Sequence, residues 1–245
     1  MSQHQYGEAF YDSLDATSEP SATIILPMLL DLVSVNSAID VGCGDGSWLN
    51  VLRQLGIEDV LGLDAPGRSG SSLKIPESRF RMVALEEPFS IEREFDLALC
   101  LEVAEHLPLE RAAGLVADLS ALAPIILFSA AIPGQGGVNH FNEQWPAFWA
   151  ELFANESYVA LDPFRRTVWN KPEVAWWYKQ NMMLFVLRTA LPDHPSLATT
   201  SPPEAPLALV HPDAWKAMVR RAEPGFGRWL RMAMSALARS LGKDR

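Results

Sequence analysis

The chain contains 245 residues, of which 49% are hydrophobic, and its formal net charge is −10. This length is enough for one large α/β core and too short for two complete enzyme domains. The acidic balance disfavours nucleic acid as a partner, because a phosphate backbone requires a basic surface. The two cysteines, Cys43 and Cys100, lie in apolar strand-like segments. The two cysteines are therefore expected to be reduced thiols in a cytoplasmic protein. Residues 1–8 are polar and do not form a signal-peptide pattern.

Short apolar segments alternate with helix-like segments, which is typical of βαβ units around a parallel sheet. The first helix, the first strand and a glycine-rich turn are followed by further strands and helices as far as residue 190. We therefore expect one domain over residues 1–190, with its core at about 20–130. The predicted strands are 38–41, 60–64, 80–85, 95–101, 125–129, 158–162 and 182–188, and the predicted helices are 21–33, 47–55, 109–122 and 143–153.

The chain changes character after the fifth predicted strand. Residues 134–181 are rich in aromatic side chains and are expected to form a cap insert. Residues 191–212 are rich in proline and predict a linker. Residues 213–245 carry eight Lys or Arg against three Asp or Glu and predict a separate basic, amphipathic helical tail.

A glycine-rich turn follows the first predicted strand and reads Asp-Val-Gly-Cys-Gly-Asp-Gly from residue 40 to residue 46. Without side chains, its glycines let the backbone bend sharply and approach a ligand closely. The helix predicted from Ser47 directs its free N–H groups into the same space. The spacing differs from the G-x-G-x-x-G turn that cradles a pyrophosphate. The acidic Asp40 and Asp45 would repel a pyrophosphate and suit a cationic ligand with an amino group.

An acidic residue, Asp64, ends the second predicted strand about 20 residues after this turn. A carboxylate in this place can accept hydrogen bonds from both ribose hydroxyls of a nucleoside. The alternative is an aspartate that only caps its own loop. The preceding glycine turn favours the functional interpretation.

From about residue 20 to residue 130, the chain resembles the class I S-adenosylmethionine-dependent methyltransferases. The resemblance rests on the glycine turn, on Asp64 and on the segment from Phe95 to Leu107. It implies a Rossmann-like, seven-stranded and mostly parallel α/β sheet with helices on both faces and an antiparallel last strand. It also implies S-adenosylmethionine as cofactor and S-adenosylhomocysteine as product. The cofactor-binding residues that it implies are Asp40, Gly42, Cys43, Gly44, Asp45, Gly46, Asp64, Ala65, Leu85, Cys100, Leu101 and Glu102.

The chain departs from this family at the end of the third predicted strand. Many members carry an aspartate there that accepts the adenine amino group, whereas Ala84 occupies the place in this chain. Backbone groups near Leu85, or the side chain of Glu86, are the candidates to replace it.

The candidate catalytic residues are His140, His106 and Glu105. Glu102, Glu105 and His106 would share one face of a helical turn, and His140 lies in the later glycine-rich loop. Methyl transfer to oxygen requires a proton acceptor, and histidine titrates in a suitable range.

Three interpretations of these residues remain open. A histidine acts as the base without a metal. Alternatively, the carboxylates and imidazoles bind a divalent metal, as a similar arrangement in the small-RNA 2′-O-methyltransferases implies. In the third interpretation, Glu105 and His106 only brace the cofactor turn. The sequence leaves the metal unknown.

Aromatic side chains are concentrated in the predicted cap. Trp145 and Trp149, four residues apart, are interpreted as core. Three consecutive aromatic residues, Trp176 to Tyr178, cannot all face one core, so at least one is expected to line a cleft or an interface. Arg165 and Arg166 are candidates to hold an anionic group of the acceptor.

The function predicted from the sequence is methyl transfer to a small-molecule or saccharide acceptor, with a sugar hydroxyl as the favoured group. This acceptor class follows from a resemblance to bacterial methyltransferases that accompany glycosyltransferases. The alternatives are an N- or C-methyltransferase of a natural product, or a non-catalytic cofactor-binding subunit. The basic tail predicts either ordinary packing or peripheral contact with an anionic membrane. The oligomeric state is left undetermined.

Overall fold

The computed structural model describes the backbone of residues 8–65, 73–199 and 208–222. Side chains are described for residues 17–65, 73–197 and 208–222. The chain divides into two compact units, Met1–His211 and Pro212–Arg245. The helix α7 (Pro212–Ala222) is the described element of the second unit. The rest of the predicted tail, from residue 223 on, lies outside the described residues.

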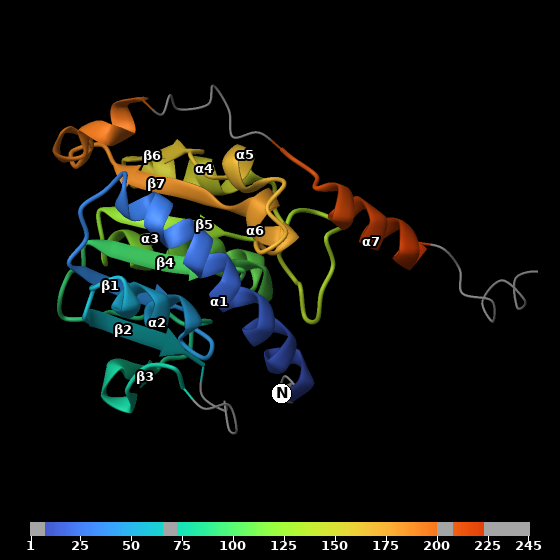
Figure 1. Ribbon diagram of the computed structural model, residues 1–245, viewed down its shortest axis with the longest axis horizontal. Coiled ribbons are helices and arrows are strands. Elements are labelled where there is room, and N and C mark those ends of the chain that lie inside the picture. Colours follow the sequence, from blue (N-terminus) through green and yellow to red (C-terminus); the bar gives the residue numbers. More distant parts are fainter. Residues whose placement is uncertain (1–7, 66–72, 200–207, 223–245) are drawn as a thin grey trace, which may run out of the picture. The chain divides into compact units, whose positions relative to one another are not determined.

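The first unit contains a seven-stranded sheet (Figure 1). The strand order is β3-β2-β1-β4-β5-β7-β6, and β7 runs antiparallel to both of its neighbours, β5 and β6. This is the predicted mostly parallel sheet with one late antiparallel strand. Its strands are β1 (Ser37–Val41), β2 (Asp59–Asp64), β3 (Phe80–Met82), β4 (Leu97–Leu101), β5 (Ile125–Ser129), β6 (Tyr158–Leu161) and β7 (Met183–Leu187).

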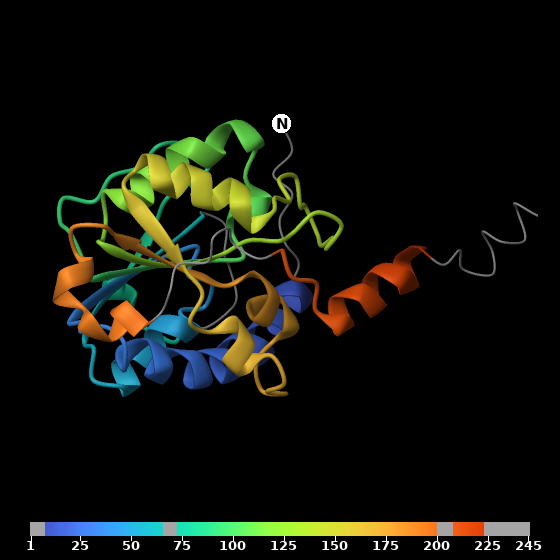
Figure 2. The ribbon, with the colours of Figure 1, turned by 90° about the horizontal axis from the view of Figure 1, so that it is seen from above.

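Helices cover both faces of the sheet (Figure 2). On one face, α1 and α2 form a core with side chains such as Leu26 and Leu49, and on the other face α3 and α4 form a second core with side chains such as Leu115 and Phe153. The central strands β4 and β5 are therefore buried at every position, which explains their continuous apolar sequence. The helices of this unit are α1 (Glu8–Leu30), α2 (Ser47–Gln54), α3 (Ala112–Ser120), α4 (Pro146–Asn155), α5 (Arg165–Val168) and α6 (Trp176–Asn181).

The strand order places a topological switch point between β1 and β4. From β1 the chain proceeds to β2 and β3 on one side, and β4 and β5 then extend the sheet on the other side. Open α/β sheets bind ligands in the crevice beyond the carboxyl ends of the strands at such a point. The glycine turn after β1 and the segment from Glu102 to His106 after β4 both begin at this edge.

Several element limits differ from the prediction. The strand β3 ends at Met82 instead of residue 85, because it pairs only with the last three residues of β2 at the edge of the sheet. The first helix begins at Glu8 and continues through Pro20 and Pro27. The helix predicted from Leu109 begins as a 3-10 turn, η3 (Leu109–Arg111), before α3.

Part of the segment predicted as a linker folds against the first unit. Residues 191–199 form two 3-10 helices, η4 (Leu191–Asp193) and η5 (Pro195–Thr199). Leu197 is buried in the same core as α1 and α2, so these residues behave as part of the domain. Within the described part of the chain, no helix combines the length and apolar character needed to cross a bilayer.

Candidate active site

A cavity of about 370 Å³ opens at the carboxyl edge of the sheet, at the switch point between β1 and β4. A volume of this size falls in the range of small-ligand pockets. Its lining residues come from the glycine turn, the end of β2, the segment after β4, the loop before α4 and the helix α6. Ten of the twelve predicted cofactor-binding residues line it: Asp40, Gly42, Cys43, Gly44, Asp45, Asp64, Ala65, Leu85, Leu101 and Glu102.

The backbone of the glycine turn adopts the left-handed conformations that glycine permits. Gly42 and Gly46 have φ angles of 83° and 81°. A Cβ atom at Gly42 would lie 2.3 Å from Cγ2 of Val103, and one at Gly46 would lie 3.0 Å from Cγ1 of Ile75. Gly42 is therefore required both for its conformation and for the close approach of the segment after β4. Gly46 is not among the residues that line the cavity, so its role is to shape the turn.

The Asp64 carboxylate is oriented by two backbone groups. The N–H of Gly44 donates to Oδ2 at 2.6 Å, and the N–H of Ala65 donates to Oδ1 at 2.7 Å. This arrangement ties the end of β2 to the glycine turn after β1. A carboxylate held in this way at the cavity wall is suited to accept further hydrogen bonds from a ligand.

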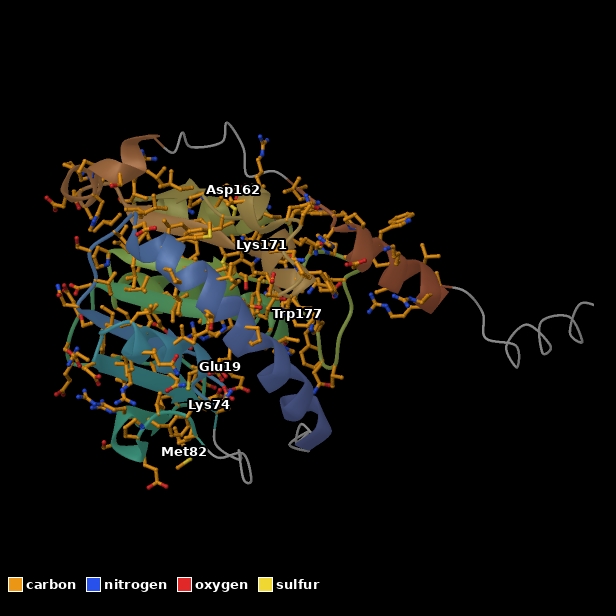
Figure 3. All side chains as sticks on the ribbon, in the orientation of Figure 1. Glu19, Lys74, Met82, Asp162, Lys171 and Trp177 are labelled. Carbon is orange, nitrogen blue, oxygen red and sulfur yellow. The ribbon has the colours of Figure 1, made fainter. Side chains whose placement is uncertain are left out.

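Asp45 lines the cavity, but its carboxylate is engaged by the protein. The N–H of Ser47 donates to Oδ1 at 2.8 Å, which caps the start of α2. Lys74 lies 3.1 Å from Oδ2 and 2.7 Å from the carboxylate of Glu19 on α1 (Figure 3). These contacts outweigh burial and lower the pKa of Asp45. The sequence did not reveal this pairing, and Asp45 has a structural role here.

Asp40 and Cys100 have the most desolvated positions among the predicted cofactor residues. Burial, together with the charges of Asp64 and Asp45, raises the pKa of Asp40 well above its usual value. Cys100 is fully buried in the core on the α3 side of the sheet and does not line the cavity. Burial also raises the pKa of its thiol. The structure therefore does not bring Cys100 to the cavity with its neighbours Leu101 and Glu102, because successive strand residues point to opposite faces.

The adenine end of the predicted site is formed by Leu85 and Glu86, which both line the cavity. The carbonyl of Leu85 already accepts a hydrogen bond from Nε of Arg111 at 3.0 Å. Glu86 is exposed, so its side chain is accessible at this wall.

Glu105 lies beneath the cavity with no exposed surface. Neither of its carboxylate oxygens has a hydrogen-bond partner in the described part of the chain. Burial and the neighbouring charge of Glu102 raise the pKa of Glu105 well above its usual value. The loop that carries His140 is anchored here, because the N–H groups of Phe141 and Asn142 donate to the Glu105 carbonyl at 2.7 and 3.1 Å.

The two predicted catalytic histidines lie together at the cavity. The rings of His106 and His140 pack edge to face with 4.9 Å between their centroids. Burial lowers the pKa of His106 to about 4, and the proximity of His140 contributes to this shift. His106 is therefore neutral at physiological pH.

Each histidine also has an oxygen acceptor near Nδ1. Nδ1 of His106 lies 3.3 Å from the carbonyl of Asn139, and Nδ1 of His140 lies 3.1 Å from the Glu143 carboxylate. Glu143 in turn accepts the N–H groups of Gly134, at 2.7 Å, and Gly136. With Nδ1–H donating to these oxygens, Nε2 carries the lone pair on both rings.

Aromatic side chains of α6 form part of the cavity wall. Trp176, Trp177 and Tyr178 all line the cavity, so the expectation that at least one would do so is confirmed. Trp149 is buried against Phe128, as expected for a core residue. Trp145 is 41% exposed, and its interpretation as core is wrong, because α4 begins after it and leaves it in the loop.

The assignment of Arg165 and Arg166 to an anionic ligand group is not supported. Arg165 is fully buried, donates to the Gln180 carbonyl at 3.0 Å and forms an ion pair of 2.7 Å with Asp162. Arg166 is exposed on α5. Neither residue lines the cavity.

Sequence reasoning missed several residues of the site. Ser18 of α1, Trp48 of α2 and Gln135 of the glycine-rich loop also line the cavity. Glu143 supports His140, and its position three residues after the histidine was the signal that could have identified it. The other three residues are far apart in the chain, and only the fold brings them together.

The family comparison agrees with this geometry. Residues 17–124 match a family model described as a methyltransferase domain. None of the curated proteins matches the chain.

Solved structures support the same fold. An O-methyltransferase family protein from Burkholderia thailandensis is 15% identical, with 74% of this chain and 59% of that chain covered and a TM-score of 0.56. CalS10, an amino pentose methyltransferase from Micromonospora echinaspora, is 13% identical, with 76% and 100% covered and a TM-score of 0.54. DesVI from Streptomyces venezuelae is 12% identical, with 75% and 99% covered and a TM-score of 0.51.

Residues 17–124 therefore match a methyltransferase domain, and the fold around them is shared with solved methyltransferases. The predicted enzyme class and the predicted Rossmann-like fold are confirmed.

Proposed function

We propose that this chain transfers a methyl group from S-adenosylmethionine to a hydroxyl group of a small molecule, with sugars as the first acceptor class to test. The observation that carries the proposal is the convergence of two sets of residues on one cavity. The glycine turn and Asp64 form a site suited to a nucleoside that carries an amino acid, and Glu105, His106 and His140 lie at the same cavity.

The residues of the first set fit the cofactor. Asp40 and the backbone of residues 42–45 would hold its amino-acid end, since the acidic and glycine-rich wall suits a ligand with an amino group. The oriented carboxylate of Asp64 would accept the ribose hydroxyls, with Ala65 beside it. Leu85 and Glu86 would contact the adenine. When bound, S-adenosylmethionine supplies a methyl group on a positively charged sulfur.

His140 is the favoured proton acceptor for the acceptor hydroxyl. Its Nδ1 faces Glu143, which holds the ring in the tautomer with a lone pair on Nε2 and stabilises the imidazolium that forms. His106 lacks a carboxylate in this position, because its Nδ1 faces a backbone carbonyl. Since general-base catalysis contributes typically 10²–10⁴-fold, the remaining acceleration comes from holding the two reactants in line.

A divalent cation is a second candidate component of this site. One ligand atom from each of Glu105, His106 and His140 can be chosen so that all three lie within 4.8 Å of one another. Two imidazoles and one carboxylate suit a transition-metal ion better than Mg²⁺, which prefers oxygen ligands. A cation here would replace the proton on Glu105 and give a partner to its two oxygens, which lack hydrogen-bond partners in the described residues.

The first test is calorimetric titration with S-adenosylhomocysteine, followed by a screen of sugars, nucleotide sugars, glycolipids and phenols with labelled S-adenosylmethionine. We expect saturable binding and transfer of label to a hydroxyl. His140→Ala should lower turnover by about 10²–10⁴-fold and leave binding intact, whereas His194→Ala, outside the cavity lining, should change neither. Binding without transfer to any acceptor would favour a non-catalytic subunit, and transfer to an amine would replace the hydroxyl.

The cation is tested separately. Titration of the purified protein with Mn²⁺ alone should give saturable binding that Glu105→Gln weakens, and excess chelator should abolish turnover. Full turnover in excess chelator would remove the cation from the proposal and leave the histidine base in place.

A further inference from the structure

A buried network of side-chain amides connects the segment after β4 with the helix α6 and the loop that carries His140. Its members are Gln135, Gln180 and Asn181, each at most 5% exposed, and it ends on the carboxylate of Glu102. Glu102 and Gln135 line the cavity, whereas Gln180 and Asn181 do not. The network therefore connects buried residues to a charged group at the cavity wall.

Glu102 has an unusual backbone conformation for a residue with a side chain. Its φ angle is 56°, in the left-handed region, and its N–H donates to the Ser129 carbonyl at 2.9 Å. Such conformations are energetically costly for residues other than glycine, and they are found where the surrounding structure stabilises them. The conformation brings the Glu102 side chain toward the cavity and toward α6.

The Glu102 carboxylate is held by two amide donors. Nδ2 of Asn181 lies 3.0 Å from Oε1 and 3.2 Å from Oε2, and Nε2 of Gln135 lies 3.1 Å from Oε2. Both donors are neutral, so they orient the carboxylate without cancelling its charge. A fixed negative charge at this wall complements a cofactor whose sulfur is positively charged.

The remaining hydrogen bonds determine which way each amide faces. Nδ2 of Asn181 and Nε2 of Gln180 both donate to Oε1 of Gln135, at 3.0 and 2.9 Å, and Nε2 of Gln180 also donates to Oδ1 of Asn181 at 3.0 Å. Oε1 of Gln180 accepts the N–H of His211 at 2.8 Å. If Asn181 were flipped, its oxygen would face Glu102 and these bonds would be lost. A satisfied buried network of this kind rigidifies the groups that it connects.

We propose that Asn181 and Gln135 are positioning residues, which aim the Glu102 carboxylate at the bound methyl donor and tie the loop that carries His140 to that carboxylate. The loop connection is direct, because Gln135 belongs to the same loop as His140, and Glu143 binds the backbone on both sides of Gln135. The cofactor wall and the proton acceptor then move as one unit. This inference rests on the proposed function.

The test replaces one amide donor by a carboxylate of the same shape. In Asn181→Asp and Gln135→Glu, the new oxygen faces Glu102 at the present distance of about 3 Å, and two ionised carboxylates this close repel each other. Repulsion turns the Glu102 carboxylate away from its present position, so we expect affinity for S-adenosylmethionine, which carries the positively charged sulfur, to fall at least about tenfold at pH 8.5, which corresponds to about 1.4 kcal/mol. Near pH 6, a shared proton restores one hydrogen bond, so the affinity should return to within about threefold of that of the unchanged protein.

Asn50→Asp is the matched control, since it makes the same change from amide to acid at a half-buried residue of α2 that neither lines the cavity nor belongs to the network. It should show the same pH dependence of binding as the unchanged protein, even if its melting temperature falls. Melting temperatures of all variants separate loss of fold from loss of binding. If the acidic variants do not fold, Asn181→Ser and Gln135→Met, which add no charge, replace them in the binding measurements.

The outcomes are distinct. If the unchanged protein does not bind S-adenosylmethionine, the proposed function fails and the positioning role fails with it. If it binds, but Asn181→Asp and Gln135→Glu show the same affinities and pH dependence as Asn50→Asp, the positioning role alone is overturned. With the uncharged variants, an unchanged affinity in the folded proteins would overturn it equally.

Discussion

Substitution of Gly42 by alanine tests the glycine turn on which the site depends. The φ angle of 83° at Gly42 is left-handed, and an added Cβ would lie 2.3 Å from Cγ2 of Val103. The left-handed conformation costs a residue with a side chain about 1–2 kcal/mol. Overpacking against the adjacent segment adds about 1–3 kcal/mol. The expected loss in the free energy of unfolding is therefore about 2–5 kcal/mol.

Gly56→Ala supplies the matched comparison, because Gly56 has a φ angle of 97° and no atom within 4 Å of the position of an added Cβ. It should show only the conformational cost of about 1–2 kcal/mol. Urea denaturation of both variants measures the difference, and the double variant Gly42→Ala/Val103→Ala should regain part of the steric loss. Equal losses for the two single variants would refute the argument that the turn is limited by close approach.

Three further predictions concern single side chains. Asp64→Asn should weaken S-adenosylhomocysteine binding at least about tenfold, or about 1.4 kcal/mol, as measured by calorimetry; unchanged affinity would remove Asp64 from the ribose site. Burial, with the charge of Glu102, raises the pKa of Glu105, so the folded state retains a proton that the unfolded state releases, and stability falls as pH rises above about 4.3. Glu105→Gln should therefore melt at a higher temperature than the unchanged protein near pH 8, with the difference disappearing below about pH 4; a constant difference would contradict this. Arg165→Leu should cost about 3–5 kcal/mol in urea denaturation, since it leaves Asp162 buried without its cation, whereas Arg166→Leu on the exposed side of α5 should change stability by less than about 0.5 kcal/mol; similar effects for both would show that the ion pair is not important.

The sequence was sufficient to predict the sheet because the strands have local signals. β5 was predicted at its observed limits, Ile125–Ser129, since a continuous apolar segment of this length fits a strand buried on both faces. The edge strand β3 was predicted too long, because the end of an edge strand depends on its single neighbour, β2. The arrangement of Asp40 and Asp64 at one edge also followed from the sequence, since parallel strands end at the same side.

The contacts between distant segments could not be predicted from local patterns. Asp45 was expected to face a ligand, but Lys74 forms an ion pair with it from a loop that the sequence does not place there. Arg165 was expected at the surface of a binding site, but Asp162 allows it to be buried. Both cases show that the partner of a charged side chain decides its role, and the partner is supplied by the tertiary fold.

The amide network also could not be predicted from local sequence patterns. Gln135 and Asn181 are 46 residues apart, and their hydrogen bonds to Glu102 exist only because β5, β7 and the segment after β4 meet at one edge of the sheet. Uncharged amides carry no pattern that would single them out in a sequence.

A crystal structure of the chain grown with S-adenosylhomocysteine tests the central claim most directly. We predict density for the nucleoside in the cavity, with its ribose hydroxyls within hydrogen-bonding distance of Asp64 and its amino-acid end against the glycine turn. Ligand density at any other place, or an empty cavity at saturating ligand concentration, would contradict the account.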